Sequence, residues 1–440
     1  MKKLAALFGI DGAVLAIVLN RAFMIIQAPL FIYFLLRYLS PAEQGFWYTF
    51  KSLSALSVFA ELGFTVIITQ FVSHEFAHLK MRGGFLRGSR QGRDRLFSLV
   101  MYAMQFYLFV VPLVVLLLSG AGALVFRRDS GVVLAAWLCY SVLGGANVVT
   151  TLVQAVYQGL DKAAEVQRNV LAGTVAIFAC TCSLLWLKAG IWALVFGTFC
   201  GIALMLVLLW RISAPFWLQL ARHRFRSRPS WFREVVSLQW RYAISWISGY
   251  LTFHFMIPVA KYYAGPVEAG RLGMSISMVS AIQALAGAWV MARIPQLNMM
   301  VALKQREELH ALMSKIQRVS MFAFCGCALA LVAAVLWVFP LLHWQDRILP
   351  LSQILLLLLV VCSNIITGNW AFYLRAHKEE PYMLISLIMS VTLAACVWGG
   401  MMLYKSTFFA VASYAVLGWL ALFAARVIYV NKRKEYDAVK

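Results

Sequence analysis

Five polar side chains recur at intervals of three and four residues along one apolar stretch: Lys51, Ser54, Ser57, Glu61 and Thr65. At about 100° per residue, this spacing predicts one narrow stripe on a single helix. The residues between them are apolar or small. Charge on an apolar membrane helix is costly unless it faces a water-filled cavity or a partner charge. The stripe therefore indicates a cavity or coupling site, with Lys51, Ser54, Glu61 and Thr65 as candidate residues.

A second polar stripe has spacings of four, three and four residues: Arg241, Ser245, Ser248 and Thr252. Three further basic residues lie near the ends of apolar stretches: Arg21, Lys261 and Arg271. Because Arg and Lys pair well with phosphate groups, we expect Arg21, Lys51, Arg241, Lys261 and Arg271 to bind an anionic substrate. Ser245, Ser248 and Thr252 would line the same cavity. Glu61 would pair with a cationic side chain or bind a coupling proton or cation.

These residues also have a purely structural interpretation. Long basic side chains near helix ends can reach the membrane interface by snorkelling, and all five basic candidates lie near such ends. Ser and Thr hydroxyls can bond to a carbonyl one turn earlier in their own helix. Glu61 lies too deep in its apolar stretch to snorkel, so it is the strongest candidate for a functional role.

The composition indicates an all-α integral membrane protein. Of the 440 residues, 62% are hydrophobic and 13% are charged, and the mean hydropathy is +0.80. Runs of about 20 apolar residues predict membrane-spanning helices. Twelve spans are expected: 14–39, 46–73, 97–119, 132–159, 169–187, 190–210, 236–262, 269–292, 319–342, 350–374, 382–403 and 407–429.

The distribution of basic residues predicts the orientation. The net charge is +22, with 39 Lys and Arg against 17 Asp and Glu. Most of these Lys and Arg residues fall in loops on the side of the membrane where both termini lie. By the positive-inside rule, both termini are cytoplasmic. The basic clusters therefore orient the chain, and a nucleic-acid partner is not expected.

An internal repeat predicts two six-helix halves around a central cavity. The expected division is an N-terminal bundle over 1–212, a basic cytoplasmic linker over 213–234 and a C-terminal bundle over 235–440. The turns Ser40–Gly45 and Gly265–Gly270 both fit the pattern x-P-x-E-x-G, each after the first helix of its half. Because each half has an even number of spans, the two halves run in the same sense.

Neither a metal nor a cofactor site is expected. The eight Cys residues lie in apolar runs without a C-x-x-C pair, and are interpreted as small buried hydrophobic residues. His74 and His78 have metal-ligand spacing, but Glu75 is their only companion. The outer loops are short, and no catalytic motif is recognisable, so the chain is not expected to be an enzyme.

The segment Leu39–Gly45, followed by an aromatic pair and then Glu61–Phe64, resembles the opening of the polysaccharide flippases. These are Wzx-like O-antigen transporters of the MOP superfamily. The motif covers about 40 residues, and beyond it the likeness is one of architecture: twelve spans, two halves and a basic linker. The two extra helices of the lipid II flippases are missing from this sequence.

The resemblance implies a flippase of the bacterial inner membrane. Its substrate would be an undecaprenyl-pyrophosphate-linked oligosaccharide, moved by alternating access for O-antigen or other surface polysaccharide. The implied partners are this lipid-linked oligosaccharide, membrane lipid, a polysaccharide polymerase, a chain-length regulator and a coupling ion, either proton or sodium. The alternatives are an ion-coupled multidrug exporter of the same superfamily and a non-transporting scaffold or polymerase of polysaccharide assembly.

Overall fold

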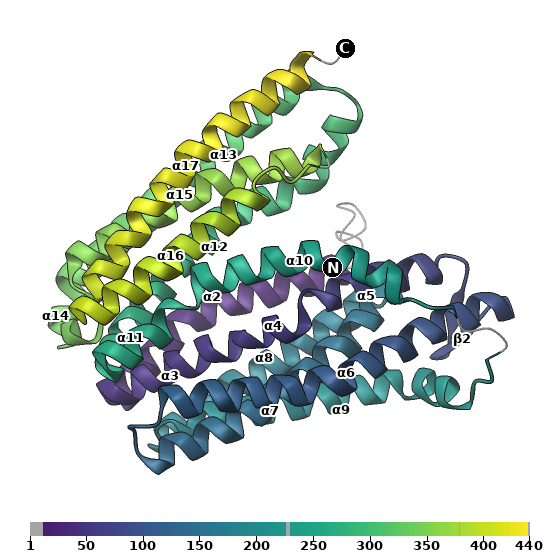
Figure 1. Ribbon diagram of the computed structural model, residues 1–440, viewed down its shortest axis with the longest axis horizontal. Helices are drawn as coiled ribbons and strands as arrows, with labels where there is room; N and C mark the ends of the chain where they lie inside the picture. The colour runs from purple at the N-terminus through teal and green to yellow at the C-terminus, as the bar shows by residue number, and fades with distance from the viewer. Residues whose placement is uncertain (1–11, 226–228, 378, 439–440) are drawn as a thin grey trace. The chain divides into compact units, whose positions relative to one another are not determined.

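The computed structural model describes residues 12–225, 229–377 and 379–438. The described chain divides into two compact units (Figure 1). The first contains the residues up to Glu43 and Leu53–Ile247. The second contains Gln44–Ser52 and the residues from Ser248 onward. Two helices contribute to both units, namely α3 (Pro41–Ser54) and α10 (Phe232–Phe253).

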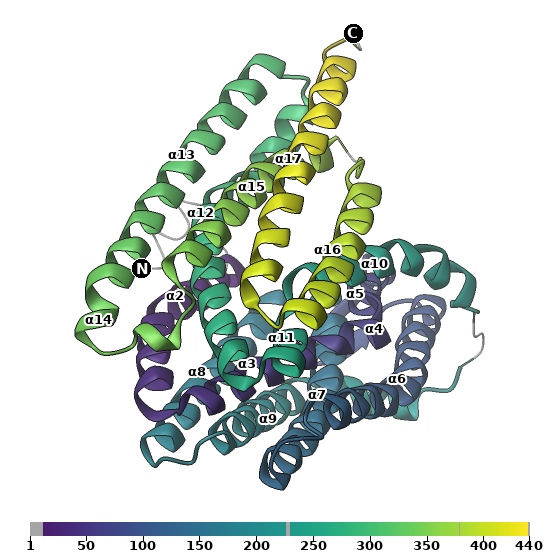
Figure 2. The ribbon, with the colours of Figure 1, turned by 60° about the vertical axis from the view of Figure 1, so that its left-hand side comes forward.

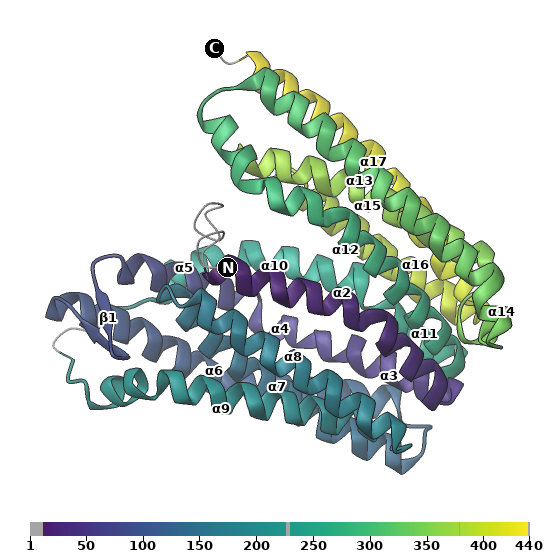
Figure 3. The same cartoon turned by 180° about the vertical axis from the view of Figure 1, so that it is seen from behind.

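The first unit is a bundle of long helices. α2 packs on α8, α8 on α9, and α7 on α5, α6 and α9, and Figure 3 shows α2 and α8 side by side. Small residues allow close contact within this bundle, since a Cβ on Gly197 or Gly201 of α9 would overlap a side chain of α8. Its elements are α2 (Gly12–Tyr38), η1 (Ala55–Ser57), α4 (Val58–Glu61), α5 (Phe64–Phe76), α6 (Arg90–Val125), α7 (Gly131–Gly159), α8 (Ala163–Trp186) and α9 (Trp192–Arg222).

A short hairpin follows α5, in a segment where the sequence pattern indicates only a basic loop. Strands β1 (Lys80–Arg82) and β2 (Phe85–Arg87) pair antiparallel. Gly83 and Gly84 form the turn with φ of +59° and +80°, a conformation that glycine adopts without strain. Gln219 of α9 holds the hairpin, since it accepts a hydrogen bond from Leu86 N (2.7 Å) and donates one to Leu86 O (2.9 Å).

The second unit is also a helical bundle (Figure 2). α12 packs on α11, α13 and α15, while α17 packs on α15 and α16. Asn369 of α15 donates a hydrogen bond to Gln317 of α13 (3.1 Å). Beyond α3 and α10, its elements are α11 (Met256–Ala264), α12 (Pro266–Ala302), α13 (Arg306–Ala333), the π segment η2 (Ala334–Val338), α14 (Phe339–Leu341), η3 (Gln345–Arg347), α15 (Leu351–Ala376), α16 (Met383–Tyr404) and α17 (Thr407–Ala438).

The helices confirm the predicted all-α membrane fold. In the described chain, nine helices are long and apolar enough to span a membrane, or eleven if each of two bent pairs counts as one span. α2 adds a shorter apolar segment, Ile26–Tyr38. The predicted number of twelve spans agrees roughly with this count. The chain is therefore a multi-pass membrane protein.

Two predicted spans are not continuous helices. The prediction of one helix over 46–73 is wrong, because the chain passes through η1 and α4 and then bends by 51° between Glu61 and Phe64. The span predicted over 236–262 is likewise broken, with a bend of 41° between Phe253 and Met256. The Lys51–Thr65 stripe therefore does not lie on a single helix.

The two x-P-x-E-x-G segments begin α3 and α12 in the same way. Pro41 and Pro266 occupy the first position of each helix, where a missing N–H costs nothing. Within the second unit, Gln44 donates a hydrogen bond to Gly270 O (3.0 Å). A Cβ on Gly45 would overlap the carbonyl oxygen of Pro266. Glycine at this position is what allows the two helix starts to touch.

Candidate functional site

The helix break after Glu61 is the centre of the candidate site. α4 ends at Glu61, and the next two residues adopt left-handed backbone conformations, with φ of +48° at Leu62 and +74° at Gly63. For a bulky residue such as Leu62 this conformation is strained. At membrane depth, an interrupted helix also leaves backbone groups that need partners within the protein or in a water-filled cavity. Such breaks are typical of transporter binding sites.

Helix α10 covers this break within the first unit. Gln239 of α10 donates a hydrogen bond to the backbone carbonyl of Glu61 (3.5 Å). A Cβ on Gly63 would lie 2.7 Å from Tyr242 Cβ and 2.8 Å from Trp246 Nε1. The absence of a side chain at Gly63 therefore allows α10 to approach the interrupted backbone.

The Glu61 side chain is half-exposed and has polar neighbours on two other helices. Thr151 of α7 and Tyr107 of α6 both lie near its carboxylate. Tyr107 is buried, and its hydroxyl makes no hydrogen bond to the described residues. The rest of the surroundings are aromatic, with Phe64 stacked on Phe106 at a centroid distance of 4.2 Å. A carboxylate beside two hydroxyls has the chemistry to take up a proton or a small cation.

The other members of the first stripe are accessible at the surface of their own units. Lys51 is exposed, with Nζ 5.8 Å from the centroid of the Trp47 ring. Ser54 and Thr65 are half-buried. Thr65 lies on α5, beyond the break, so it does not continue the line of Lys51 and Ser54 on α3.

The second stripe lies on α10, and its residues differ in burial. Ser245 is exposed, whereas Ser248 is buried. Thr252 donates a hydrogen bond to Ser248 O (2.8 Å), the local bond that the structural interpretation expects. The backbone of Arg241 belongs to this helix, but its side chain lies outside the described part of the structure, as does that of Arg21 on α2.

The two remaining basic candidates lie in the second unit and have local partners. Lys261 of α11 is buried, with Nζ 5.9 Å from the centroid of the Phe46 ring. Arg271 of α12 pairs with Glu268 (2.7 Å) and donates a hydrogen bond to Asp346 O (2.8 Å). Substrate binding by these two residues stays a prediction, since these contacts neither require it nor exclude it.

Three residues beside Glu61 have no clear signal in the sequence pattern. Tyr107 and Thr151 lie in long apolar helices and form no polar stripe, and Gln239 lies near the start of α10, outside the polar stripe. Each of them reaches Glu61 through packing between distant segments, which residue spacing within one helix does not reveal. Among the described residues, no group of three His, Cys, Asp or Glu is arranged to hold a metal ion.

The comparison with known families adds to this geometry. Residues 12–301, more than half of the chain, match the family model described as "Polysaccharide biosynthesis protein". The chain belongs to the polysaccharide biosynthesis protein family. The matched range includes the helix break at Glu61–Gly63 and both polar stripes. No curated protein sequence matches this family member.

Solved structures of MOP superfamily transporters share the fold of this polysaccharide biosynthesis protein. The lipid II flippase MurJ in an inward closed conformation matches with a TM-score of 0.62 at 10% identity, covering 94% of this chain and 86% of that chain. An inward-facing multidrug resistance MATE family transporter matches with a TM-score of 0.61 at 10% identity, covering 91% and 95%. A MOP superfamily transporter from Pyrococcus furiosus matches with a TM-score of 0.51 at 12% identity, covering 98% and 97%. The resemblance to the MOP superfamily is thereby confirmed, and at these identities the matches establish the fold alone.

Proposed function

We propose that this protein is a flippase that moves an undecaprenyl-pyrophosphate-linked oligosaccharide across the bacterial inner membrane by alternating access. The observation that carries the proposal is the interrupted helix at Glu61–Gly63, in a family of polysaccharide biosynthesis proteins with a transporter fold. A half-exposed carboxylate at a helix break is costly unless the site is used. The proposed product is the same lipid-linked unit on the outer leaflet, for O-antigen or another surface polysaccharide.

Basic and acidic residues would have different roles in this cycle. Arg21, Lys51, Arg241, Lys261 and Arg271 would bind the pyrophosphate or acidic sugars. Glu61 would bind the coupling proton or cation, with Tyr107 and Thr151 as neighbouring oxygen donors. Uptake and release of that ion would change the charge at the helix break and so favour one conformation over the other.

The two sequence halves would be the moving parts. In this proposal, the bundles over 1–212 and 235–440 alternate between inward and outward access, except that α10 up to Ile247 moves with the first bundle, to whose unit it belongs. The lipid tail stays in the bilayer. The termini and the basic linker over 213–234 would be cytoplasmic, where the lipid-linked unit is assembled. A polysaccharide polymerase and a chain-length regulator would act on the exported unit.

The decisive experiment locates the lipid-linked repeat unit in a deletion strain. For a flippase, the unit accumulates on the inner leaflet and reaches the outer leaflet when the gene is restored. Unit-length chains on the surface of the deletion strain would instead indicate a polymerase, and a complete repeat unit on the outer leaflet without the protein would exclude transport by it.

Substitutions at the stripe test the site itself. Glu61→Gln keeps the shape but removes the charge, and we expect export to fall about fivefold or more, the usual size of coupling between two sites. Lys51→Ala is expected to weaken substrate binding about tenfold, the value of one charge-assisted hydrogen bond. Export is measured in the deletion strain at matched protein levels.

Two exposed residues of α13 provide matched controls, with Glu307→Gln for the carboxylate and Lys315→Ala for the amine. Both controls should export at the parent level. Parent-level export by Glu61→Gln and Lys51→Ala as well would show that the first stripe is structural.

A further inference from the structure

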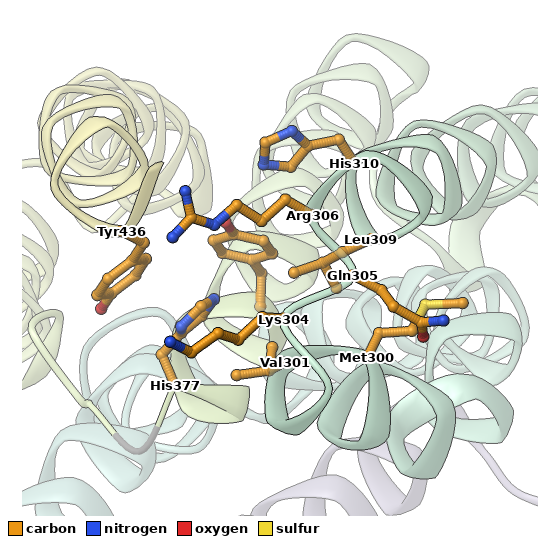
Figure 4. A pocket seen from close by; sticks show the side chains of 10 residues that line it. Met300, Val301, Lys304, Gln305, Arg306, Leu309, His310, His377 and Tyr436 are labelled. Atoms are coloured by element: carbon orange, nitrogen blue, oxygen red, sulfur yellow. The ribbon is translucent and has the colours of Figure 1, made fainter. Parts of the chain in front are cut away.

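A second polar site lies entirely within the second unit, and none of its lining residues belongs to either polar stripe. A cavity of about 270 Å³ opens where α12 ends and α13 begins, next to the C-terminal ends of α15 and α17 (Figure 4). Its walls come from four helices that pack on one another around a buried cluster including Leu309, Met313 and Tyr373. The cavity is therefore part of the bundle itself.

Two basic side chains of the α12–α13 turn enter this cavity. Lys304 and Arg306 extend across it toward His377 and Tyr436 (Figure 4). Lys304 has a left-handed backbone with φ of +55°, and the turn is held because Gln305 N donates a hydrogen bond to Met300 O (3.0 Å). The backbone therefore places both cations on the same side of the cavity.

Aromatic rings form the opposite wall. His377 stacks on Tyr436 with a centroid distance of 3.9 Å and an interplanar angle of 8°. The ring centroid of Tyr373 lies 5.0 Å from that of His377, and the ring centroid of His310 lies 6.4 Å from that of Tyr373. Imidazole N–H groups can donate hydrogen bonds to an anion. The Tyr436 hydroxyl lies beside the Glu379 carboxyl, so the ring of Tyr436 contributes its face to this wall.

The cavity lining is positively charged. None of the ten residues that line it is acidic. Glu307 and Glu308 follow Arg306 on α13 but are exposed and do not line the cavity. Of the neighbouring acids, Glu379 and Glu435 both pair with Lys432, at 2.9 and 3.0 Å. The hydrogen bond from Lys432 lowers the pKa of the Glu379 carboxyl, so this acid stays ionised and paired.

We infer that this cavity binds a phosphate or pyrophosphate group, as a site separate from the proposed transport site. Two cations, imidazole N–H donors and the N-terminal end of α13 together have the chemistry of phosphate recognition. The volume suits a small anionic group and is smaller than that of a typical drug-sized pocket. The group could belong to an anionic phospholipid headgroup or to a soluble phosphate compound. This inference does not rest on the proposed flippase activity.

Calorimetric titration of the purified full-length chain, in phosphate-free buffer and neutral detergent, tests the site with inorganic pyrophosphate as probe. The test variant is Lys304→Asn with Arg306→Gln, because Asn tolerates the left-handed backbone at position 304. We expect this double variant to bind the probe about tenfold or more weakly, since each lost contact is a hydrogen bond to a charged group. The control is Lys315→Gln with Arg318→Gln, two exposed cations of α13 outside the cavity, which should bind as the parent does.

Competition by lipid distinguishes the two sources of phosphate. If short-chain phosphatidylglycerol displaces the probe from the parent and short-chain phosphatidylcholine does not, the site binds anionic headgroups. Saturable probe binding without such competition assigns it to a soluble compound. The inference is overturned if the parent binds neither pyrophosphate nor phosphatidylglycerol, or if the double variant binds them as tightly as the parent. Pyrophosphate binding by Lys51→Ala is measured in parallel. Any loss of binding in this variant reports the proposed transport site and not the cavity.

Discussion

Gly63 determines the geometry around Glu61 at the scale of single residues. Its φ of +74° is easily reached by glycine, and its missing side chain leaves room for Tyr242 and Trp246 of α10. Glu61 thus ends a helix whose continuation is displaced and covered by another helix. The polar stripe identifies Glu61 as a candidate residue, but Gly63, two residues later, determines where its carboxylate lies.

Gly63→Ala is expected to destabilise the first unit. Alanine in the left-handed region costs about 1–2 kcal/mol, and the new Cβ adds a similar cost by crowding α10. We expect a lower apparent Tm of the detergent-solubilised protein and reduced export at matched protein levels. Gly120→Ala on α6 is the control, because a Cβ there meets no atom within 4 Å. Equal Tm values for the two variants would mean that the break is not a fixed feature of the fold.

The spacing of residues in the sequence predicts contacts only between residues on the same helix. Glu61 stands out because a carboxylate is rare in an apolar run. The pairing of Glu268 with Arg271 also follows from their separation of three residues on α12. Tyr107 beside Glu61, and Asp346 beside Arg271, depend on segments far apart in the chain, so spacing along one helix does not reveal them.

At the scale of elements, the spans are predictable and their interruptions are not. Long apolar runs must be helical in a membrane because no water satisfies their backbone groups, so the bundle follows from composition. The interruption at Leu62–Gly63 carries no change in composition, because Phe64 and the residues after it are as apolar as those before. Glycine is also common within continuous membrane helices, so Gly63 alone does not predict a break. The bend depends on packing against α10, a contact between distant segments.

The contact between the starts of α3 and α12 gives a prediction at the same scale. Gly45→Ala places a Cβ on the carbonyl oxygen of Pro266, and backbone cannot move aside as a flexible side chain does. The shift would also strain the hydrogen bonds from Gln44 to Gly270 and to Arg347. We expect the free energy of unfolding to fall by about 1–3 kcal/mol, seen as a lower Tm.

Gly249→Ala on α10 is the matched control for Gly45→Ala, because a Cβ there meets no atom within 4 Å. It should leave the Tm unchanged or raise it slightly, since alanine favours a helix over glycine. If Gly45→Ala is as stable as this control, the two repeated segments do not need to touch.

At the scale of the whole molecule, the sequence predicts the orientation from the distribution of charge and the family from the opening motif. The opening motif resembles that of the polysaccharide flippases, and the match to the polysaccharide biosynthesis protein family and the transporter fold agree with that resemblance. The basic loops predict the orientation in the membrane. The cavity at Lys304 and Arg306 was not predicted, because the turn resembles any other basic loop. Its lining is assembled from helix ends more than a hundred residues apart, at Arg306 and Tyr436.

Orientation in the membrane is the remaining prediction at this scale. The distribution of basic residues predicts that both termini and the α12–α13 turn are cytoplasmic, and that the α6–α7 loop lies outside. In spheroplasts, a membrane-impermeant maleimide should label Arg128→Cys, in the exposed α6–α7 loop, more strongly than the parent with its native cysteines. Glu307→Cys, exposed after the α12–α13 turn, should react above that background only once the membrane is permeabilised. The opposite labelling pattern would place the basic loops outside, and with them the cavity that we assign to phosphate groups.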